Sequence, residues 1–290
     1  MEELYILKLL IGAIVLTFIY HGTEYRTVLC GIIMLSGLFL YTFAGYLYRS
    51  AEIRKLQKNI RDNIPSQWTA RDTGEGFQRP SKVRLGVFGV QNSGKSSFLN
   101  SLHFAFNGNW EEVYDEKGNA LDGGETMFRD PVKLSDYVTT FDTRGLVELS
   151  MSSVPVVLAE ITGQQRIDTR SHAPGEKIDC PIFILRYSSA RKKEHYDEFL
   201  GSLVRELKQN LYRYPILVVT FADNNQRYCW RDQILRDITS AGMAKGSVFF
   251  IENYTAKNHE MDSEKHIALL EILEACIKRA DDSITFRWRK

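Results

Sequence analysis

The chain has 290 residues, a formal net charge of +1 and a hydrophobic content of 44%. This length accommodates one large α/β domain with an appendage, or two small domains. The near-neutral charge gives no electrostatic case for a nucleic-acid partner. The four cysteines form no CxxC pair and no metal-type spacing, so we expect free thiols in a reducing compartment.

Residues 1–48 are predicted to form a transmembrane helical hairpin. Residues 28–48 carry no charge, and about 20 apolar residues in a helix span the hydrocarbon core of a bilayer. Residues 5–20 are shorter and carry Lys8, which can snorkel to the headgroups. A cleaved signal peptide is the alternative for this first segment, but its start is acidic and no small-residue cleavage site follows it.

Basic residues set the predicted orientation of this hairpin. The short loop between the two segments contains Arg26, whereas the chain after residue 48 contains Arg49, Arg54, Lys55, Lys58 and Arg61. The positive-inside rule then places the C-terminal domain in the cytosol. The sequence therefore predicts an integral membrane protein with the lipid bilayer as a partner, in which residues 49–80 form a juxtamembrane helix and a linker.

From residue 81 the chain alternates between strand and helix patterns. Short apolar runs predict strands over residues 83–89, 138–141, 181–185, 216–220 and 247–251. Helical spacing of apolar residues predicts helices over residues 95–106, 192–212 and 266–279. This alternation predicts an α/β domain over residues 81–290, with a mostly parallel sheet flanked by helices.

The stretch GVQNSGKS, residues 89–96, matches the phosphate-binding pattern G-x-x-x-x-G-K-[ST] between a predicted strand and a predicted helix. The glycines let successive backbone N–H groups face phosphate oxygens, and the helix start adds its positive dipole end. Lys95 is placed to reach the β- and γ-phosphates, and the Ser96 hydroxyl to bind Mg²⁺. The predicted phosphate-binding residues are Gly89, Gln91, Asn92, Ser93, Gly94, Lys95, Ser96 and Ser97.

The stretch FDTRG supplies a second motif at the end of a predicted strand. Asp142 at a strand tip, followed by the flexible Gly145, is typical of Mg²⁺ coordination and γ-phosphate sensing. A threonine that closes over the γ-phosphate is expected between the two motifs, and Thr126 in DGGET is our candidate. We therefore predict Ser96, Thr126 and Asp142 as metal ligands, and Lys95 and Thr126 as catalytic residues.

Two later stretches indicate how a base is read. TFAD, residues 220–223, follows a predicted strand where GTP-binding domains carry [NT]KxD. Asp223 can accept hydrogen bonds from guanine N1 and N2, whereas the usual lysine is replaced by Phe221, whose ring offers a stacking face instead. Thr255-Ala256-Lys257 is similar to the SAK loop that reads guanine O6 through a backbone N–H. Thr220, Asp223, Thr255 and Ala256 are the predicted base-site residues.

Together the four motifs resemble the P-loop GTPase superfamily over residues 81–280. The stretches RLGVFGVQNSGKSSFLNSL, FDTRGL and FIENYT are most similar to the interferon-induced protein 44 family. This resemblance implies a G-domain fold, binding of GTP or GDP with Mg²⁺, and a role in immune or stress responses. The resemblance to large GTPases further implies self-association across the G domain.

Hydrolysis is expected to be slow or dependent on a partner. Leu146 stands directly after the second motif, where Ras-like enzymes place a glutamine that orients the attacking water. Two alternatives remain open at this stage. One is an ATP-using P-loop enzyme in which Asp223 is purely structural. The other is a nucleotide-stabilised scaffold without catalysis, which Leu146 and Phe221 both favour.

Overall fold

The structure of the 290-residue chain is a computed structural model. It describes residues 23–62, 82–114, 131–143, 145–164, 177–186, 196–210, 214–221 and 227–288. The chain divides into two compact units, Met1–Glu52 and Ile53–Lys290. The domain boundaries predicted above, 1–48, 49–80 and 81–290, stay predictions.

Helix α2 (Thr23–Asp62) contains the second segment of the predicted membrane hairpin. Its described side chains are apolar or uncharged from Ile33 to Tyr48, after which Arg49 begins a charged stretch. In the part of the chain that the structure describes, no helix is at once long enough and apolar enough to cross a bilayer.

This finding corrects two predictions: the transmembrane hairpin over residues 1–48 and the integral-membrane localisation with a cytosolic C-terminal domain are wrong. It gives no support to the predicted lipid bilayer partner. The first predicted segment, residues 5–20, lies outside the described residues.

Six strands form one sheet in the order β2-β3-β1-β4-β5-β6. Strand β1 is parallel to β3 and β4, β4 to β5 and β5 to β6, while β2 is antiparallel to β3. The strands are β1 (Val83–Gly89), β2 (Pro131–Lys133), β3 (Val138–Asp142), β4 (Cys180–Arg186), β5 (Ile216–Thr220) and β6 (Val248–Phe250). The sheet is mostly parallel, so the predicted α/β class with a mostly parallel sheet is confirmed.

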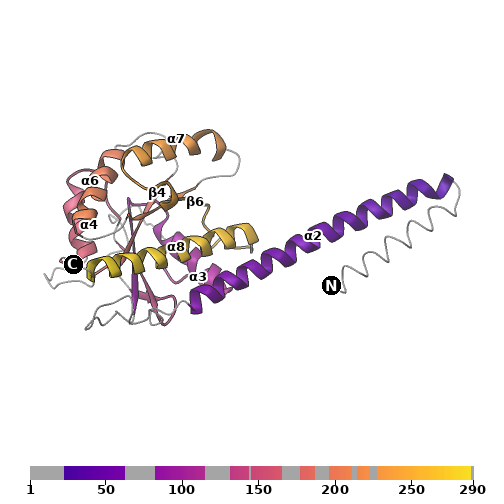
Figure 1. Cartoon of the computed structure of the whole chain (residues 1–290), viewed down its shortest axis with the longest axis horizontal. Helices are drawn as coiled ribbons and strands as arrows, with labels where there is room; N and C mark the ends of the chain where they lie inside the picture. The colour runs from indigo at the N-terminus through magenta and orange to yellow at the C-terminus, as the bar shows by residue number, and fades with distance from the viewer. Residues whose placement is uncertain are drawn as a thin grey trace. The chain divides into compact units, whose positions relative to one another are not determined.

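Helices cover both faces of the sheet (Figure 1). Helices α3 (Lys95–Asn107) and α8 (Ser263–Trp288) share one buried cluster with Val83, Leu85 and Val87 of β1. Helices α4 (Ser153–Thr162), α6 (Tyr196–Gln209) and α7 (Arg227–Ser240) contribute to a second cluster, which contains Phe88. The two clusters lie on opposite faces because successive side chains of a strand point in opposite directions.

The predicted elements and the observed ones differ mainly at their ends and in polar segments. Helix α8 begins before the predicted 266–279 and extends to Trp288. Helix α6 ends at Gln209, before the predicted end at residue 212, and residues 192–195 of that prediction lie outside the described ones. Helix α7 was not predicted, because its polar sequence buries only Ile234 and Ile238 among its described side chains. Strand β2 has three residues in the described range, too few for an apolar pattern to emerge.

The end of α2 belongs to the core of the α/β unit. Ile53 and Ile60 are buried in the cluster that contains α3 and α8, whereas the residues between them are mostly polar or charged. The Gln57 side-chain amide donates to the carbonyl of Ala105 at 2.8 Å. The guanidinium of Arg61 lies 5.2 Å from the centroid of the Phe106 ring. Residues 53–62 therefore pack on α3 through an apolar stripe flanked by polar contacts.

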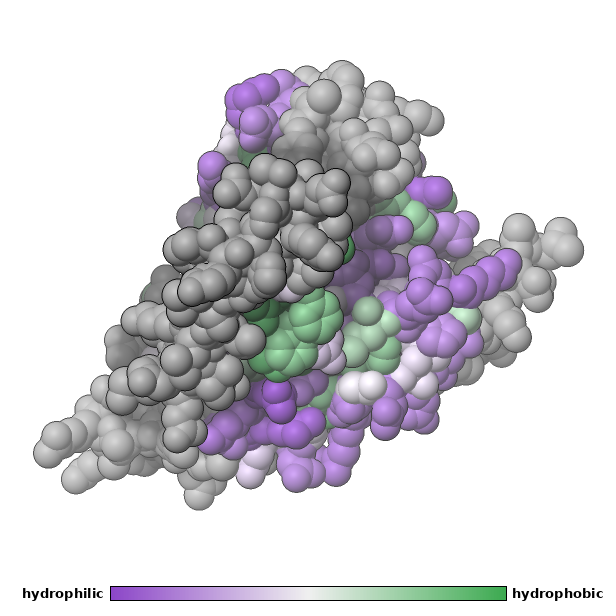
Figure 2. Space-filling view, turned by 90° about the vertical axis from the view of Figure 1, so that its right-hand side faces the viewer, coloured by the Kyte–Doolittle hydropathy of each residue, from purple (hydrophilic) through white to green (hydrophobic). Residues whose placement is uncertain are grey.

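Large exposed apolar side chains of the described chain are concentrated on one helix. On the face in Figure 2, a group of hydrophobic side chains lies next to hydrophilic ones. Most of the large exposed hydrophobic residues belong to α2 between Ile33 and Tyr48. The others are scattered singly, which is ordinary for a protein surface. Among them is Phe221, half exposed at the end of β5, and its position matters for the candidate site.

His103 couples the stability of this fold to pH. It lies in α3 with 5% of its surface exposed, and its ring meets the edge of Tyr114 at 6.2 Å between centroids. Burial lowers the pKa of His103 from 6.5 to about 4. Between these values the unfolded chain binds more protons than the folded one, so stability falls as the pH falls from 7 towards 4.

We predict that His103→Phe, which keeps a buried ring but removes the titrating group, makes the chain less sensitive to acid. The His103 pKa shift accounts for a loss of about 2 kcal/mol in the free energy of unfolding between pH 7 and pH 5. Urea denaturation of both chains at these two pH values measures it. An unchanged difference between pH 7 and pH 5 in the variant would show that His103 is not responsible.

Candidate functional site

Glycines shape the loop between β1 and α3, here called the P-loop (residues 89–96). Gly89 ends β1 with φ 151°, and a Cβ there would lie 2.4 Å from the Ile184 carbonyl oxygen on neighbouring β4. Gly94 stands before α3 with φ 90°, and Asn92 between them has φ 57°. A side chain at Gly89 would thus drive β1 and β4 apart, so this position requires glycine.

The P-loop and the end of β3 meet through side chains. The Ser96 hydroxyl donates a hydrogen bond to Asp142 Oδ2 at 2.6 Å. Lys95 Nζ donates to the Val90 carbonyl at 3.0 Å, across the curl of the loop. The contact between Ser96 and Asp142 arises because β1 and β3 are parallel neighbours, which places their carboxyl ends at one edge of the sheet.

Burial perturbs both charged groups of this site. Asp142 is 2% exposed and Lys95 is 7% exposed. Burial raises the pKa of Asp142, while the Ser96 hydroxyl, the Lys95 charge and the Thr143 backbone oppose that rise. Burial likewise lowers the pKa of Lys95, against the opposing charge of Asp142. Each charge is thus only partly compensated by the other, which is typical of a site that awaits a charged ligand.

The residues present fit a divalent cation such as Mg²⁺. Asp142 Oδ1 is buried and has no hydrogen-bond partner among the described residues, and Asp142 Oδ2 already lies beside the Ser96 hydroxyl. No group of three or more His, Cys, Asp or Glu side chains with metal-binding spacing occurs in the described parts of the chain. A site that takes one hydroxyl and one carboxylate from the protein, with the rest from phosphate and water, suits Mg²⁺. The third predicted ligand, Thr126, lies outside the described residues.

The segment after Asp142 pairs with the P-loop through its backbone, which no sequence pattern indicated. Leu146 N–H donates to the Gly89 carbonyl at 2.9 Å, and Gln91 N–H donates to the Leu146 carbonyl at 2.9 Å. A Cβ on Gly145 would lie 2.9 Å from Gln91 Cα, so this approach also needs glycine. The Gln91 N–H, predicted to face phosphate, is therefore already engaged in this structure.

The stretch TFAD is tied to the P-loop at its first residue. Buried Thr220 donates its hydroxyl proton to the Ser93 carbonyl at 2.6 Å. Phe221, which follows, has a left-handed φ of 55°. Asp223, which is predicted to bind guanine, lies outside the described residues. In the first turn of α3, the carbonyl of Ser97 accepts a hydrogen bond from the Ser101 hydroxyl. Of TFAD, the structure thus places Thr220 and Phe221 beside the P-loop.

The loop after β6 is also tied to the P-loop, by a residue that the sequence reasoning missed. Asn253 donates its side-chain amide to the Gly94 carbonyl at 3.1 Å. Beyond it, Thr255 and Asn258 exchange backbone hydrogen bonds at 3.1 Å and 3.0 Å, which leaves Ala256 at the tip of a tight turn. An asparagine in a loop is too common to mark a site, so only the folded chain identifies Asn253.

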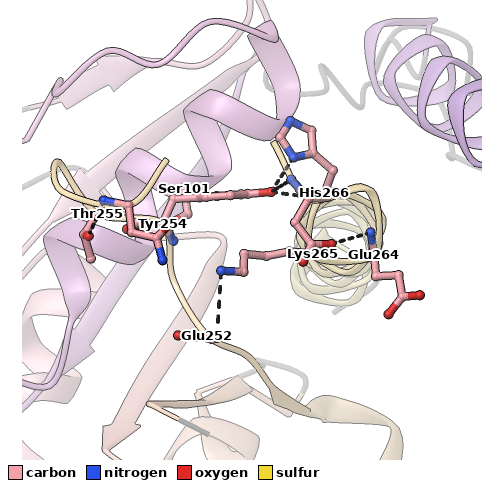
Figure 3. A network of polar contacts seen from close by, with 9 residues as sticks. Ser101, Glu252, Tyr254, Thr255, Glu264, Lys265 and His266 are labelled. Carbon is pink, nitrogen blue, oxygen red and sulfur yellow. Dashed lines mark hydrogen bonds and ion pairs between the residues drawn. The ribbon is translucent and has the colours of Figure 1, made fainter. Parts of the chain in front are cut away.

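Tyr254 anchors this turn between α3 and α8 (Figure 3). Its backbone N–H donates to Ser101 Oγ of α3 at 2.8 Å. Its hydroxyl donates to the Asp262 carbonyl at 2.9 Å, accepts from the Asp262 N–H at 3.0 Å and contacts His266 Nδ1 at 2.7 Å. Since the hydroxyl has one proton, His266 is the donor in the last contact. The turn that carries Thr255 and Ala256 is therefore fixed to the two helices.

Comparisons with known proteins leave the family open. No family model matches the chain. A von Willebrand factor A domain-containing protein of Dictyostelium discoideum is 22% identical over 247 residues, which are 76% of this chain and 32% of that protein. The chain thus spans about a third of this relative's length. The resemblance to the interferon-induced protein 44 family and the self-association that was expected stay predictions.

Among solved structures, a dimerization-deficient mutant of Toc33 from Arabidopsis thaliana matches 72% of this chain and 86% of its own. The TM-score is 0.44 and the sequence identity is 15%. At this TM-score and identity, the likeness carries no argument about the fold or the function of this chain.

We predict that Tyr254→Phe loosens the turn at residues 255–258. Removal of the hydroxyl leaves the Asp262 N–H and His266 Nδ1 without this partner, which costs about 1–3 kcal/mol of stability. Hydrogen exchange of the Thr255 and Asn258 amides, measured by NMR, is expected to accelerate in the variant.

Tyr114→Phe is the matched control, because it removes a buried hydroxyl that contacts Thr140 of β3 instead. Equal exchange rates at Thr255 and Asn258 in wild type and Tyr254→Phe would contradict the anchoring role.

Proposed function

We propose that the chain binds GTP and GDP with Mg²⁺ at the P-loop and the tip of β3. The observation that carries this proposal is the 2.6 Å hydrogen bond between Ser96 and Asp142. It joins the two sequence motifs at the N-terminus of α3, next to the buried Lys95. A hydroxyl, a carboxylate, a buried ammonium and a helix N-terminus together suit a Mg²⁺-bound polyphosphate.

In this proposal the P-loop binds the phosphates, and residues of the P-loop and β3 hold Mg²⁺. Lys95 exchanges its contact with the Val90 carbonyl for the β- and γ-phosphates, and N–H groups of residues 92–97 bind phosphate oxygens. Ser96 and Asp142, with Thr126, would hold Mg²⁺, which supplies positive charge to the phosphates when bound. Gly145 senses the γ-phosphate through its backbone, and Thr126 closes over it.

The base is assigned to the loops after β5 and β6. Thr220 and Asn253 support this, because their side chains tie these loops to the Ser93 and Gly94 carbonyls of the P-loop. In the proposal, Asp223 accepts hydrogen bonds from guanine N1 and N2, and the N–H of Ala256, in the turn begun by Thr255, donates to O6. The phosphates and the base would then be bound at neighbouring loops on one edge of the sheet.

Hydrolysis is proposed to be slow in the isolated chain. The position after Gly145 is Leu146, whose partly buried side chain packs against the core cluster that contains Phe88. A leucine offers no hydrogen bond to a water, and this one is engaged in packing. Fast cleavage would therefore need a group supplied by a partner or by a second copy of the chain.

Calorimetric titration of the full chain with GTP, GDP and ATP in the presence of Mg²⁺ tests the proposal. We expect GTP and GDP to bind more tightly than ATP, and Lys95→Ala to weaken GTP binding by about 10- to 150-fold, as for loss of a charged hydrogen bond. Lys208→Ala is the control, since this lysine contacts Tyr214 instead.

Two outcomes would contradict the proposal in different ways. ATP binding equal to or tighter than GTP binding would favour an ATP-using P-loop enzyme. Rapid single-turnover cleavage of GTP by dilute chain would refute the slow-hydrolysis part.

We predict that the Mg²⁺-dependent part of GTP affinity falls in mild acid. Burial raises the pKa of Asp142, so its carboxylate takes up a proton at a higher pH than an ordinary aspartate does. The protonated acid is a poor Mg²⁺ ligand, and affinity decreases as the pH falls through this raised pKa. Titrations at a series of pH values with Mg²⁺ and with EDTA measure the difference. In Asp142→Asn, the Mg²⁺-dependent part of GTP affinity should be small and should not change with pH. The same pH dependence in wild type and variant would show that protonation of Asp142 is not the cause.

A further inference from the structure

Backbone strain among the described non-glycine residues is confined to the P-loop and its border. Asn92 has φ 57° and Phe221 has φ 55°, and these are the two such residues with positive φ in the described ranges. A left-handed conformation is uncommon for any residue with a side chain and is least expected of a bulky one. Strain of this kind persists where surrounding structure holds it, and it concentrates at functional sites.

The ring of Phe221 is held at the rim of the P-loop. Its Cε2 lies 3.3 Å from the position that a Cβ on Gly94 would occupy. Thr220, the residue before it, is fixed to the Ser93 carbonyl. Phe221 is nevertheless 50% exposed and belongs to neither core cluster of the described residues. The chain therefore presents a large aromatic surface to solvent at the edge of the phosphate site, at a cost in backbone strain.

Arg186 lies against this ring. It ends β4 directly beside Thr220 of β5, and its guanidinium carbon is 4.8 Å from the centroid of the Phe221 ring. An arginine in this geometry makes a cation–π contact and leaves its own planar face available for stacking. The pair combines an aromatic face with positive charge, next to the loop proposed to hold phosphates.

We propose that Phe221, supported by Arg186, is the platform on which the purine base of the bound nucleotide stacks. This inference rests on the proposed function and assigns the base contact that the missing lysine of [NT]KxD would make. Stacking on an aromatic ring is nearly indifferent to which base is bound, because every base has a π-face. The platform thus supplies affinity, while the edge-reading groups at Asp223 and Ala256 supply the choice of guanine.

Binding of GTP and of inorganic tripolyphosphate to the full chain separates the base contact from the phosphate contacts. We expect Phe221→Leu to weaken GTP binding by about tenfold or more, as for loss of one base stack. Tripolyphosphate, which has no base, should bind Phe221→Leu and wild type equally, and this also verifies that the variant is folded. Phe221→Tyr retains the ring and should bind GTP as wild type does.

A second set of variants tests Arg186. Arg186→Gln is expected to weaken GTP binding by a smaller factor of about two- to fivefold, because it removes the support of the ring but not the ring. The matched control is Arg231→Gln, since Arg231 lies 5.0 Å from the Phe250 ring in a similar contact. Tighter GTP binding by Arg186→Gln would overturn the proposal, because Arg186 would then be competing with the base for the ring.

The outcomes separate this inference from the proposed function. If wild type binds GTP and Phe221→Leu binds it with the same affinity, the stacking platform alone is refuted. Wild-type chain that binds neither GTP nor tripolyphosphate would refute the proposed function and the platform together. Loss of tripolyphosphate binding in Phe221→Leu would also count against the platform, since the residue would then support the P-loop and not the base.

Discussion

The candidate site depends on the close approach of β1 and β4 at Gly89. No side chain fits between this residue and the Ile184 carbonyl, so the chain can turn immediately beyond the sheet and enter α3. That turn brings Lys95 and Ser96 to the edge where β3 ends in Asp142. A wider turn would separate the hydroxyl from the carboxylate, and the two motifs would no longer form one site.

The same geometry buries two opposite charges without fully compensating either. Burial dominates the pKa shifts of both Lys95 and Asp142, and their mutual attraction only opposes it. Such an arrangement costs stability in the free chain. The cost is offset by the large α/β core on both faces of the sheet, and a ligand that brings both phosphate and cation would relieve it.

Three loops are attached to the P-loop through its own backbone. Leu146 pairs with Gly89 and Gln91, Thr220 binds the Ser93 carbonyl, and Asn253 binds the Gly94 carbonyl. Single hydrogen bonds therefore link the P-loop directly to the chain at the ends of β3, β5 and β6.

Apolar periodicity and fixed glycine spacing are local properties of a chain. They were therefore enough to predict the alternation of strands and helices, the P-loop and the position of Asp142 at the end of a strand. The sequence could not determine α7 or β2, whose few buried residues leave no pattern. It misled at residues 28–48, where uncharged composition indicated a membrane span that the described helix does not bear out. Only the tertiary structure brought Asn253 and Arg186 to the site and paired the Leu146 backbone with the P-loop. Their contacts join segments far apart in the chain, and such contacts follow from the order of strands in the sheet, which no local pattern encodes.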